Sequence, residues 1–597
     1  MCGIFGYVGT KNNAAKIVLE GLKRLEYRGY DSWGVGAVPE KSDQSDQYSN
    51  KITVKKKAGK IGNANVNDLP KSTLAFGHTR WATHGGVTDI NAHPHLDCSG
   101  TIALIHNGIF ENYEEVKKNL TARGHHFRSE TDTEVAVHLI EEYAKTMIFS
   151  KTVQKAFNEM EGLNAIIVLD VKGHKLIAAR NGSPLVIGFG DGENFLASDA
   201  AALLPLTKRV HYMEDDEMAI IGERGVTLLN AKTGEHVAPR KQRLTWNVRD
   251  VEKGDYPYFM LKEIYEQPGV VADIAATDAG YAQKMAGIIK ASRGAYLVGC
   301  GTASYAAIAG EYLFSKIAKR HVNVAIGSEF GYHLDFLNRD SLVVAISQSG
   351  ETMDILESVK KAKQKGAKIM ALVNVLGSTL YREADYTILI DAGPEKGVAS
   401  TKAFIGMLAH LTLLSYAVAG KTSDGVAVLT RAVLSMKKVL SGESLKRIKT
   451  LASKLKKVEH IYVIGRGLSY PTALETALKI KEISYIHAEG LAAGELKHGP
   501  LALVTRGTPC IAYLPNDETY GANLAGAMEM KARGGYIIGI SHKPHEVFDY
   551  FIRVPDAGEA TIMPNVVVAQ LLAYELTIAR GLDPDMPRNL AKSVTVK

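Results

Sequence analysis

Cysteine is scarce in this sequence, with four residues among 597. Cys2, Cys98, Cys300 and Cys510 lie far apart and form no Cys-x-x-Cys pair. This spacing argues against a disulfide framework and against a zinc site. We therefore expect no metal ion and a reducing, cytoplasmic location.

Strong charge and long apolar runs are lacking as well. The formal net charge of +7 is mild for this length and is not gathered into a long basic run, which favours small anionic ligands over nucleic acid. The first residues have neither the basic stretch nor the apolar core of a signal peptide. The run 403–419 is apolar, but it carries His410 and Ser415 and stands alone, so we expect a buried helix and no membrane partner.

The chain has material for about three or four domains. Short β-rich runs with a few helical stretches fill the first part, whereas the second part alternates apolar strands, Gly/Ser turns and amphipathic helices. A charged stretch without periodicity separates them and is typical of a linker. We predict domains at residues 2–240, 256–430 and 431–586, a linker at 241–255 and a C-terminal tail at 587–597.

The second part repeats itself. The run 295–305 is echoed by the run 461–470, about 166 positions later, and 369–372 matches 537–540 at nearly the same offset. A constant offset over several elements indicates a duplicated domain. Each copy is predicted to be a doubly wound βα sheet that binds its ligand at the carboxyl ends of the strands.

A phosphate site is predicted in the first copy. An apolar run typical of a buried parallel strand leads into the turn 347–352 (SQSGET), and helical spacing follows. Such a turn directs backbone N–H groups and hydroxyls at the start of a helix, where an anion is favoured, and the turn 301–304 supplies a second wall. Helix capping by Ser349 or Thr352 is the alternative, although capping needs only one hydroxyl. The aligned loop of the second copy, 515–517, contains no serine.

Residue 2 is a candidate nucleophile. Removal of the initiator Met would place a thiol and a free α-amine on Cys2, and this amine can accept the thiol proton without a separate histidine. On these residues alone, Cys2 as a small buried apolar side chain is an equal alternative.

Polar loops in the first part supply the other groups that an amide hydrolase for an amino acid needs. Arg80 offers a cation for the α-carboxylate, Asp132 an anion for the α-ammonium, and Asn107 with the N–H of Gly108 offers donors for the oxyanion. Taken singly, they can also be read as a surface ion pair, a helix cap and a hairpin turn.

Together with the motifs 2–4 (CGI) and 27–32 (YRGYDS), these residues resemble the glutaminase domain of the class II, N-terminal-nucleophile (Ntn) amidotransferases. The resemblance implies an αββα Ntn-hydrolase sandwich and L-glutamine as a substrate. Trp33 departs from the small residue usual in the family and is expected to crowd the pocket. The glutamine-binding residues that the resemblance implies are Arg80, Trp81, His84, His93 and Asp132.

The second part closely resembles the isomerizing glutamine:fructose-6-phosphate amidotransferases, through 300–302, 347–352, 398–402, 475–500 and the tail. The resemblance implies an α/β and α+β chain with two sugar-isomerase (SIS) domains, fructose 6-phosphate as second substrate and no cofactor. Many members have a serine directly after Thr302, so Ala303-Ser304 predicts a shifted or absent phosphate hydroxyl. The sugar-site residues implied are Cys300, Gly301, Thr302, Ser304, Ser347, Gln348, Ser349, Thr352, Val398, Ser400, Glu475, Lys479 and Ala591.

The reaction is also implied by the resemblance. Cys2 forms a thioester and releases ammonia, which passes a gate matching Trp81 and reaches the sugar. Lys592 forms a Schiff base with the open-chain ketose, which requires a lowered pKa. Glu482 moves a proton from carbon 1 toward carbon 2, and His498 opens the ring. The product is glucosamine 6-phosphate. The histidine matching His498 reaches the neighbouring subunit in the family, which implies a homodimer.

Other interpretations stay open at the level of sequence. Lys592 can be a solvated terminal residue, Glu482 a helix-surface charge and His498 a buried structural histidine. The spacing of Glu475, Lys479 and Glu482 places all three on one helical face. The chain can also be an aminosugar-phosphate deaminase with an idle first part, or a sugar-phosphate sensor that needs neither Cys2 nor Lys592.

Overall fold

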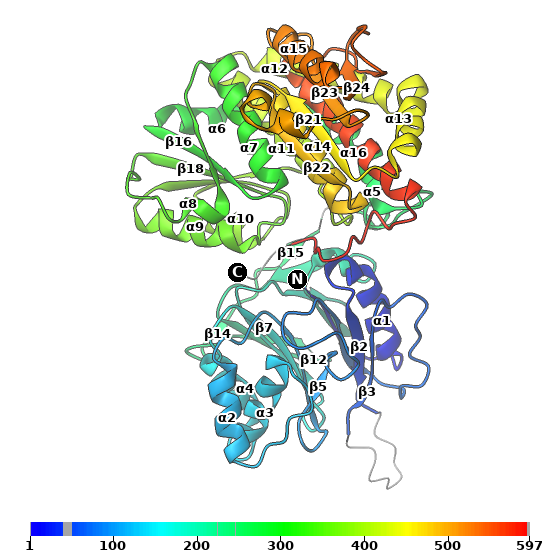
Figure 1. Ribbon diagram of the computed structural model, residues 1–597. Coiled ribbons are helices and arrows are strands. Elements are labelled where there is room, and N and C mark those ends of the chain that lie inside the picture. The colour runs from blue at the N-terminus through cyan, green and yellow to red at the C-terminus, as the bar shows by residue number, and fades with distance from the viewer. Residues whose placement is uncertain (1, 40–50, 224, 245, 594–597) are drawn as a thin grey trace. The chain divides into compact units, whose positions relative to one another are not determined.

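The computed structural model describes residues 2–39, 51–223, 225–244 and 246–593. The chain divides into two compact units. Among the described residues, the N-terminal unit runs to Val251 and includes Ser593, and the C-terminal unit is Glu252–Lys592 (Figure 1).

Two antiparallel sheets form the centre of the N-terminal unit. The first has the strand order β15-β11-β9-β10-β1-β4-β2-β3, and the second has the order β14-β13-β12-β8-β7-β6-β5. The strands of the first sheet are β1 Gly3–Gly9, β2 Ser32–Ala37, β3 Thr53–Ala58, β4 Leu74–Arg80, β9 Val186–Phe189, β10 Glu193–Ala197, β11 Arg209–Tyr212 and β15 Gln242–Arg243. Those of the second are β5 His95–Leu96, β6 Ile102–Asn107, β7 Asn164–Asp170, β8 Lys175–Asn181, β12 Glu217–Gly222, β13 Gly225–Asn230 and β14 His236–Val237.

Side-chain alternation along these strands builds three hydrophobic layers. Ile4 and Val8 of β1 face Ile105 and Ile167 of the second sheet. The opposite face of β1 packs on α1, and the outer face of the second sheet packs on α2, α3 and α4. The result is the expected αββα sandwich. Its helices are α1 Ala14–Leu25, α2 Tyr113–Ala122, α3 Asp132–Ala144 and α4 Phe149–Glu159, with short turns η1 Glu26–Arg28, η2 Ala200–Ala202 and η3 Val248–Val251.

The C-terminal unit contains two parallel sheets of the same topology. Their strand orders are β17-β16-β18-β19-β20 and β22-β21-β23-β24-β25. Each order is that of a doubly wound sheet, which confirms the duplication predicted from the repeat. The strands are β16 Gly294–Gly299, β17 Asn323–Ile326, β18 Ser341–Ser347, β19 Lys368–Val373 and β20 Tyr386–Leu389, then β21 His460–Gly465, β22 His487–Ala492, β23 Pro509–Leu514, β24 Tyr536–Ser541 and β25 Tyr550–Arg553.

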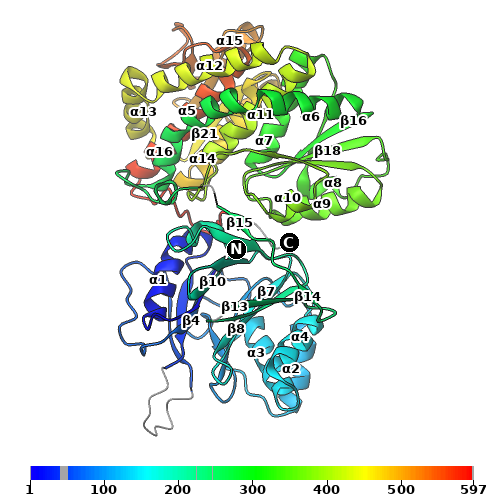
Figure 2. The ribbon, with the colours of Figure 1, turned by 180° about the vertical axis from the view of Figure 1, so that it is seen from behind.

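Helices cover both faces of each parallel sheet (Figures 1 and 2). In the first copy they are α7 Thr302–Leu313, η4 Phe314–Ala318, α8 Gly327–Phe330, α9 Met353–Gln364, α10 Thr379–Glu383 and α11 Lys402–Val418, preceded by α5 Phe259–Thr277 and α6 Ala279–Ala291. In the second they are α12 Thr422–Val439, α13 Gly442–Leu455, α14 Ser469–Ser484, η5 Glu495–His498, η6 Pro500–Leu503, α15 Tyr520–Ala532, η7 Gly558–Thr561 and α16 Ile562–Ala579.

One continuous core joins the two copies. Val344 of β18 and Val463 of β21 belong to the same hydrophobic cluster, which α11, α14 and α16 complete. Val343, on the other face of β18, packs instead with α9. The two sheets therefore fold as one unit because their inner faces share the same helices.

The apolar run 403–419 is an internal helix, as predicted, since every residue of α11 is buried. A second segment, Gly558–Ala579, is long and apolar enough to cross a membrane. It is 83% buried within the protein, which is the environment of a core helix.

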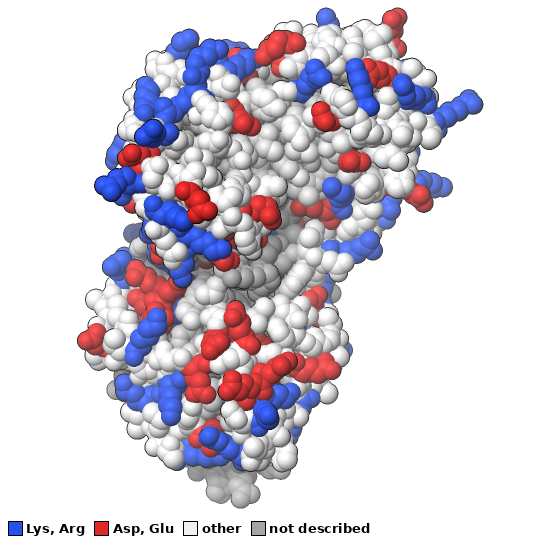
Figure 3. All heavy atoms as spheres, turned by 60° about the vertical axis from the view of Figure 1, so that its left-hand side comes forward, with Lys and Arg blue, Asp and Glu red and all other residues white. Residues whose placement is uncertain are grey.

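Charged side chains differ between the units on the face drawn in Figure 3. Lys and Arg lie mainly over the C-terminal unit, and Asp and Glu form a band over the N-terminal unit. The basic side chains drawn there are interspersed with acidic and uncharged ones. This distribution differs from the continuous basic stripe that tracks a nucleic-acid backbone.

Equivalent glycines end the first strand of each copy. A Cβ on Gly299 would lie 2.6 Å from the backbone carbon of Ala303, and a Cβ on Gly465 would lie 2.0 Å from the carbonyl oxygen of Ser469. In both copies, the first turn of the following helix therefore lies against a bare Cα. This close approach places the helix N-terminus at the edge of the sheet where ligands bind.

We predict that Gly465→Ala lowers the stability of the C-terminal unit by about 1–3 kcal/mol, because the added methyl overlaps backbone that cannot rotate away. Gly287→Ala is the matched control. Gly287 lies in α6, and a Cβ there meets nothing within 4 Å, so this change raises stability by about 0.5–1 kcal/mol. Calorimetry of the full chain measures both, and equal melting temperatures for the two variants would contradict the packing described.

Candidate functional site

Cys2 lies beside the start of β1, where neighbouring strands hold its backbone. The N–H of Gly3 donates to Thr79 Oγ1 (3.1 Å), and the Cys2 carbonyl accepts from Asn107 Nδ2 (3.0 Å). The N–H of Trp81 donates to Cys2 Sγ (3.1 Å). Burial raises the pKa of the thiol, and this N–H and the Arg80 guanidinium oppose the rise. Sγ is thus a fixed sulfur with a donor already directed at it.

The motif 27–32 braces the loop that carries Trp81. The N–H of Asp31 donates to the carbonyl of Arg80 (2.9 Å), and its carboxylate accepts from the N–H of Ala82 (2.9 Å). A Cβ on Gly29 would lie 2.8 Å from Trp81 N, so only glycine allows this approach. The motif therefore holds the loop that contains Trp81 in place next to Cys2.

Asn107 is oriented by a neutral histidine. His78 Nε2 lies 3.0 Å from both the carbonyl oxygen of His106 and Asn107 Oδ1, so this nitrogen carries the proton and donates to both. Burial lowers the pKa of His78 to about 3, which keeps the ring neutral. The Asn107 amide is thereby turned with its NH2 group toward Cys2.

Gly108 follows Asn107 with φ +126°, and a Cβ there would lie 2.2 Å from the carbonyl oxygen of Leu163. The pair ends β6, and the chain continues into α2. The alternative of a hairpin turn is therefore wrong. A side chain at position 108 would clash with Leu163 and would disfavour this positive φ, so the backbone conformation that orients the Gly108 N–H requires glycine.

Arg80 is buried, and its guanidinium donates to the carbonyls of His84, Gly85 (3.1 Å) and Gly86 (3.1 Å). The alternative of a surface ion pair is therefore wrong. Glu130 holds the same loop from the other side by accepting from the N–H of Gly86 (3.1 Å). The segment 84–86 is thus a loop shaped around one arginine.

The other predicted residues of this site lie on the surrounding elements. Asp132 begins α3, and its carboxylate accepts from the N–H of Phe110 (2.9 Å), while Thr131 caps the helix. His93 stacks on His78 with ring centroids 4.1 Å apart, and His84 contacts the ring of Tyr113 edge-on.

The departure at Trp33 is accommodated in the core. Its side chain is 3% exposed and belongs to the hydrophobic cluster that packs the first sheet on α1.

In the C-terminal unit, the two predicted phosphate turns lie side by side. They follow β16 and β18, which are adjacent parallel strands, and they precede α7 and α9. Ser347 Oγ lies 3.2 Å from Thr352 Oγ1 and accepts from the N–H of Gly350 (3.0 Å). Thr352 makes no side-chain capping bond to α9, so simple helix capping does not explain its hydroxyl. Gln348 and Ser349 are half-buried in the same turn.

The first turn contributes Cys300, Gly301 and Thr302. Gly301 has φ +55° and directly precedes the first residue of α7. Ser304 is turned inward, because its hydroxyl donates to the carbonyl of Gly301 (2.7 Å). In the corresponding loop of the second copy, the polar groups bond to one another. The Asp517 carboxylate accepts hydrogen bonds from the N–H and the hydroxyl of Thr519 (2.8 and 2.6 Å).

A charged group on α14 lies next to these turns. Lys479 is fully buried between Glu475 (3.5 Å) and Glu482, which confirms the predicted common helical face. Burial raises the pKa of Glu475 to about 8, while Lys479 and the Thr302 hydroxyl oppose that rise. The Glu482 side chain keeps 21% exposure, so it is the accessible one of the two carboxylates. The alternative of a plain surface charge is wrong.

Lys592 is drawn into the same unit by a buried carboxylate. Its ammonium lies 2.6 Å from Glu395 Oε2 and 2.7 Å from the carbonyl oxygen of Gly397, and its side chain is 6% exposed. The alternative of a solvated terminal lysine is therefore wrong. The resemblance implies a neutral amine at this position, whereas the structure places the Lys592 side chain in an ion pair with Glu395.

Glu395 collects further donors from the loop between β20 and α11. The N–H groups of Thr401 (2.9 Å) and Ala403 (3.0 Å) bind one oxygen, and the Ser400 hydroxyl (3.2 Å) binds the other. Glu263 lies behind it, accepting from the N–H of Gly397 (3.0 Å). Burial and the charge of Glu395 raise the pKa of Glu263 to about 8.

The tail reaches this loop through two anchors. Asp585 accepts from the N–H groups of Phe259 and Met260 (both 2.8 Å), and its carbonyl accepts from the N–H of Val398 (3.1 Å). The N–H of Arg588 donates to the hydroxyl of Tyr485 (2.7 Å), the residue after α14. Ala591, half-buried, continues from these anchors to Lys592.

His498 ends η5 and is exposed, so the alternative of a buried structural histidine is wrong. Three positioning residues escape the sequence argument: His78, Glu263 and Glu395. Each acts on a residue far away in sequence. The weak signal for Glu395 is its place three residues before the motif 398–402.

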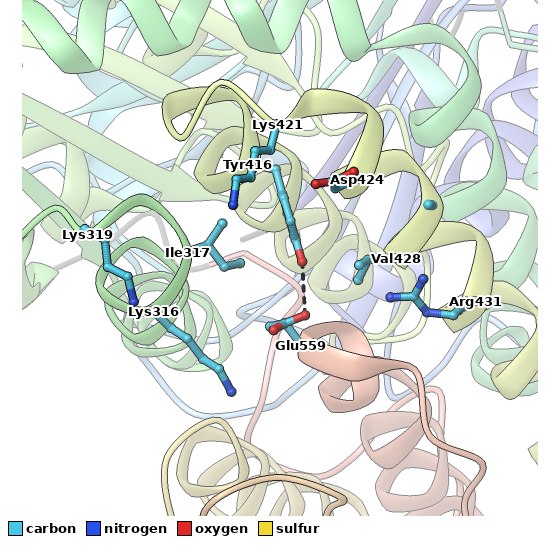
Figure 4. A pocket seen from close by; sticks show the side chains of 10 residues that line it. Lys316, Ile317, Lys319, Tyr416, Lys421, Asp424, Val428, Arg431 and Glu559 are labelled. Atoms are coloured by element: carbon cyan, nitrogen blue, oxygen red, sulfur yellow. Dashed lines mark hydrogen bonds between the residues drawn. The ribbon is translucent and has the colours of Figure 1, made fainter.

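A cavity of about 540 Å³ in the C-terminal unit lies apart from these groups. Lys319, Lys421 and Arg431 line it, and the Tyr416 hydroxyl donates to Glu559 at its wall (3.0 Å; Figure 4). None of its lining residues belongs to the phosphate turns or to the charged groups described above. Cavity size alone therefore does not locate the sugar site.

Comparison with known proteins assigns the family. The chain matches the glutamine amidotransferase domain at residues 78–205 and the SIS domain at 288–417 and 454–580. It is 43% identical to the glutamine–fructose-6-phosphate aminotransferase (isomerizing) of Pyrococcus horikoshii and 44% identical to that of Thermococcus kodakarensis, over the full length of each chain. This chain belongs to the glutamine–fructose-6-phosphate aminotransferase family. The Thermus thermophilus member is 41% identical over the full length.

A solved structure of a glucosamine–fructose-6-phosphate aminotransferase domain is similar in fold to part of this chain. The C-terminal domain of the glucosamine–fructose-6-phosphate aminotransferase from Francisella tularensis superposes with a TM-score of 0.51 at 35% sequence identity. It covers 56% of this chain and 99% of that chain. The SIS matches fall on the two parallel sheets, and the amidotransferase match falls on the antiparallel sandwich.

The buried carboxylate pair predicts a pH dependence of stability. Glu263 has a folded-state pKa of about 8 against an ordinary value of 4.5, so folding takes up a proton between these values. Its contribution to stability is full below about pH 4.5 and is lost as the pH rises toward 8, with a slope of about 1.4 kcal/mol per pH unit.

We predict that Glu263→Gln flattens the decline in melting temperature of the C-terminal unit between about pH 5 and 8, because an amide has no proton to lose. Glu383→Gln, at an exposed position of α10, keeps the wild-type slope. Calorimetry of the full chain across this range measures both, and a Glu263→Gln slope equal to wild type would contradict the assignment.

Proposed function

We propose that this protein transfers the amide nitrogen of L-glutamine to fructose 6-phosphate and isomerises the product to glucosamine 6-phosphate. The observation that carries the proposal is the pairing of two built sites in one chain. One holds a sulfur nucleophile with amide donors, and the other holds a buried lysine near hydroxyl-rich anion turns. The full-length similarity to members of the aminotransferase family supports the same conclusion.

At the first site, Cys2 attacks the side-chain amide of glutamine once Met1 is removed. During the attack the α-amine accepts the thiol proton and passes it to the leaving nitrogen, so that the C–N bond breaks and ammonia leaves. Water then hydrolyses the thioester to glutamate and frees the thiol. Asn107 Nδ2 and the Gly108 N–H stabilise the oxyanion, and His78 holds the amide in place. Asp132 binds the α-ammonium of glutamine, and Arg80 shapes the loop that meets its α-carboxylate.

At the second site, the two turns hold the sugar phosphate through Thr302, Ser347, Ser349 and Thr352, at the N-termini of α7 and α9. When the sugar binds, the Lys592 ammonium gives a proton to the Glu395 carboxylate and leaves it for the sugar carbonyl. The neutral amine then adds to the carbonyl, and loss of water gives a Schiff base.

Ammonia from the first site adds to carbon 2 of this Schiff base and displaces the Lys592 amine, which leaves an imine of the sugar with ammonia. The accessible carboxylate Glu482 then moves a proton from carbon 1 to carbon 2. The ion pair with Lys479 holds this carboxylate in position on α14.

We further propose a cytoplasmic homodimer. His498 is exposed at the end of η5, where it can reach the sugar site of a second copy and protonate the ring oxygen. The contacts at Cys2 lie within the N-terminal unit, and those at Lys592 lie within the C-terminal unit. In the described part of the chain, His498 is not among the residues that form either set of contacts. Four cysteines, none paired in a disulfide, suit a reducing compartment.

The alternative functions fit the geometry less well. An aminosugar-phosphate deaminase has no use for the donors gathered at Cys2, and a sugar-phosphate sensor has no use for a lysine buried against Glu395.

We predict that Cys2→Ala abolishes glutamine-dependent synthesis of the aminosugar but leaves synthesis from added ammonium ions within about threefold of wild type. The variant loses only the nucleophile that releases ammonia. Cys510→Ser, in the core of the second copy, is the matched control and retains glutamine-dependent activity. Loss of both nitrogen sources in Cys2→Ala would show that Cys2 supports the fold instead of the chemistry.

The reciprocal variant is Lys592→Ala. We expect loss of synthesis from either nitrogen source with retention of glutamine hydrolysis, because the amine that forms the Schiff base is absent. Lys592→Arg, which keeps the charge near Glu395 but cannot form an imine, should behave like the alanine variant. Borohydride reduction in the presence of fructose 6-phosphate should label Lys592 in the wild type. Synthesis by Lys592→Arg would overturn the assignment.

A further inference from the structure

Four metal-ligating side chains converge in the N-terminal unit, apart from the groups placed around Cys2. They are Cys98, His125, His138 and Glu141, and their ligand atoms all lie within 4.8 Å of one another. Cys98 lies in the loop between β5 and β6, and His125 follows α2. His138 and Glu141 occupy one turn of α3 and share one face of that helix.

Three of the five ligand separations below are close to those around a tetrahedral ion, one is shorter and one is longer. His125 Nδ1 and His138 Nδ1 lie 3.3 Å apart, and Cys98 Sγ lies 3.6 Å from His138 Nδ1 and 4.0 Å from His125 Nδ1. Glu141 Oε2 lies 2.8 Å from His138 Nδ1 and 3.2 Å from His125 Nδ1. Zinc bonds of about 2.0–2.1 Å to nitrogen or oxygen and about 2.3 Å to sulfur place ligand pairs roughly 3.3–3.6 Å apart.

Hydrogen bonds within the cluster explain this arrangement less well. If both Nδ1 atoms carried protons and donated to Glu141 Oε2, the two N–H groups would face each other across 3.3 Å. If only one did, the other nitrogen lone pair would point at the carboxylate and the sulfur. A cation at the centre removes both conflicts, because all four atoms then act as electron-pair donors.

The far nitrogen of His125 has a carboxylate partner. His125 Nε2 lies 3.0 Å from Glu142 Oε2, whereas His138 Nε2 lies 3.9 Å from Glu134 Oε1, beyond hydrogen-bond distance. Histidine ligands of metals commonly donate their second N–H to such a group, which fixes the tautomer and raises the basicity of the ligating nitrogen. For His125, the contact with Glu142 places the proton on Nε2 and leaves Nδ1 free to bind.

We propose that Cys98, His125, His138 and Glu141 form a structural zinc site. One thiolate, two imidazoles and a carboxylate suit Zn²⁺ among the common metals, and four protein ligands close a tetrahedral shell. Cys98 is exposed, and a cavity of about 610 Å³ lined by Cys98, His138 and Glu134 offers an entry path.

The ion would tie the loop between β5 and β6 to α3. The same helix begins with Asp132, so the site would fix the element that presents this carboxylate toward glutamine. From the sequence we expect no metal, because no two cysteines are close together in the chain. Four ligands spread over residues 98–141, with one cysteine, give no such signal.

Metal content of the full-length chain, loaded with zinc and desalted, tests the proposal. We expect about one zinc ion per chain, and a fall of at least about tenfold in Cys98→Ser and in His138→Ala. His126→Ala is the matched control, since His126 is the exposed neighbour of His125 and should keep the zinc. A zinc-free wild type, or ligand variants that retain zinc, would overturn the proposal.

Two measurements on the wild-type chain keep the test independent of variant folding. Zinc should slow alkylation of Cys98 at least about tenfold relative to the chelated protein, read by peptide mass spectrometry, because the thiolate is held by the ion. Cobalt substitution should give a sulfur-to-cobalt charge-transfer band. Unchanged alkylation of Cys98 or a cobalt spectrum without this band would contradict ligation by sulfur.

Discussion

The contact between Lys592 and Glu395 is the constraint on which the proposed sugar site depends. It fixes the chain up to Lys592 within the C-terminal unit through a buried ion pair. Removing a charged partner at such depth is costly, because Glu395 would be left buried with an unpaired charge. Glu395 also lowers the energy of its own loop, since it accepts backbone N–H groups from Thr401 and Ala403. The reactive amine and the loop around it are therefore held by one carboxylate.

Duplication gives the C-terminal unit two parallel sheets of the same topology, and the two copies contribute different groups to the proposed site. The first copy keeps hydroxyls at the carboxyl ends of the adjacent strands β16 and β18, where we propose that the sugar phosphate binds. The second copy closes the matching loop with Asp517 and contributes instead the charged face of α14. Burial opposes a rise in the pKa of Lys479 on that helix, but Glu475 and Glu482 raise it, and Glu395 of the first copy adds a smaller effect in the same direction.

The sequence suffices for what repeats or clusters locally. The two doubly wound sheets follow from the offset repeat, and the turn 347–352 follows from its hydroxyls between a strand and a helix. Glu395, Glu263 and His78 escape prediction because their roles arise from burial and from contacts with residues far along the chain. The inward turn of the Ser304 hydroxyl and the ion pair between Lys592 and Glu395 likewise depend on packing that no motif records.

The central claim is that ammonia released from glutamine at Cys2 is incorporated into the sugar bound at Lys592. Isotopic labelling tests this claim most directly. The mature enzyme is given glutamine labelled with ¹⁵N at the amide, fructose 6-phosphate and an excess of unlabelled ammonium ions. The account predicts that most of the glucosamine 6-phosphate carries ¹⁵N, because the nitrogen passes between the sites without mixing with the solvent. A product that carries only unlabelled nitrogen, or no aminosugar at all, would contradict it.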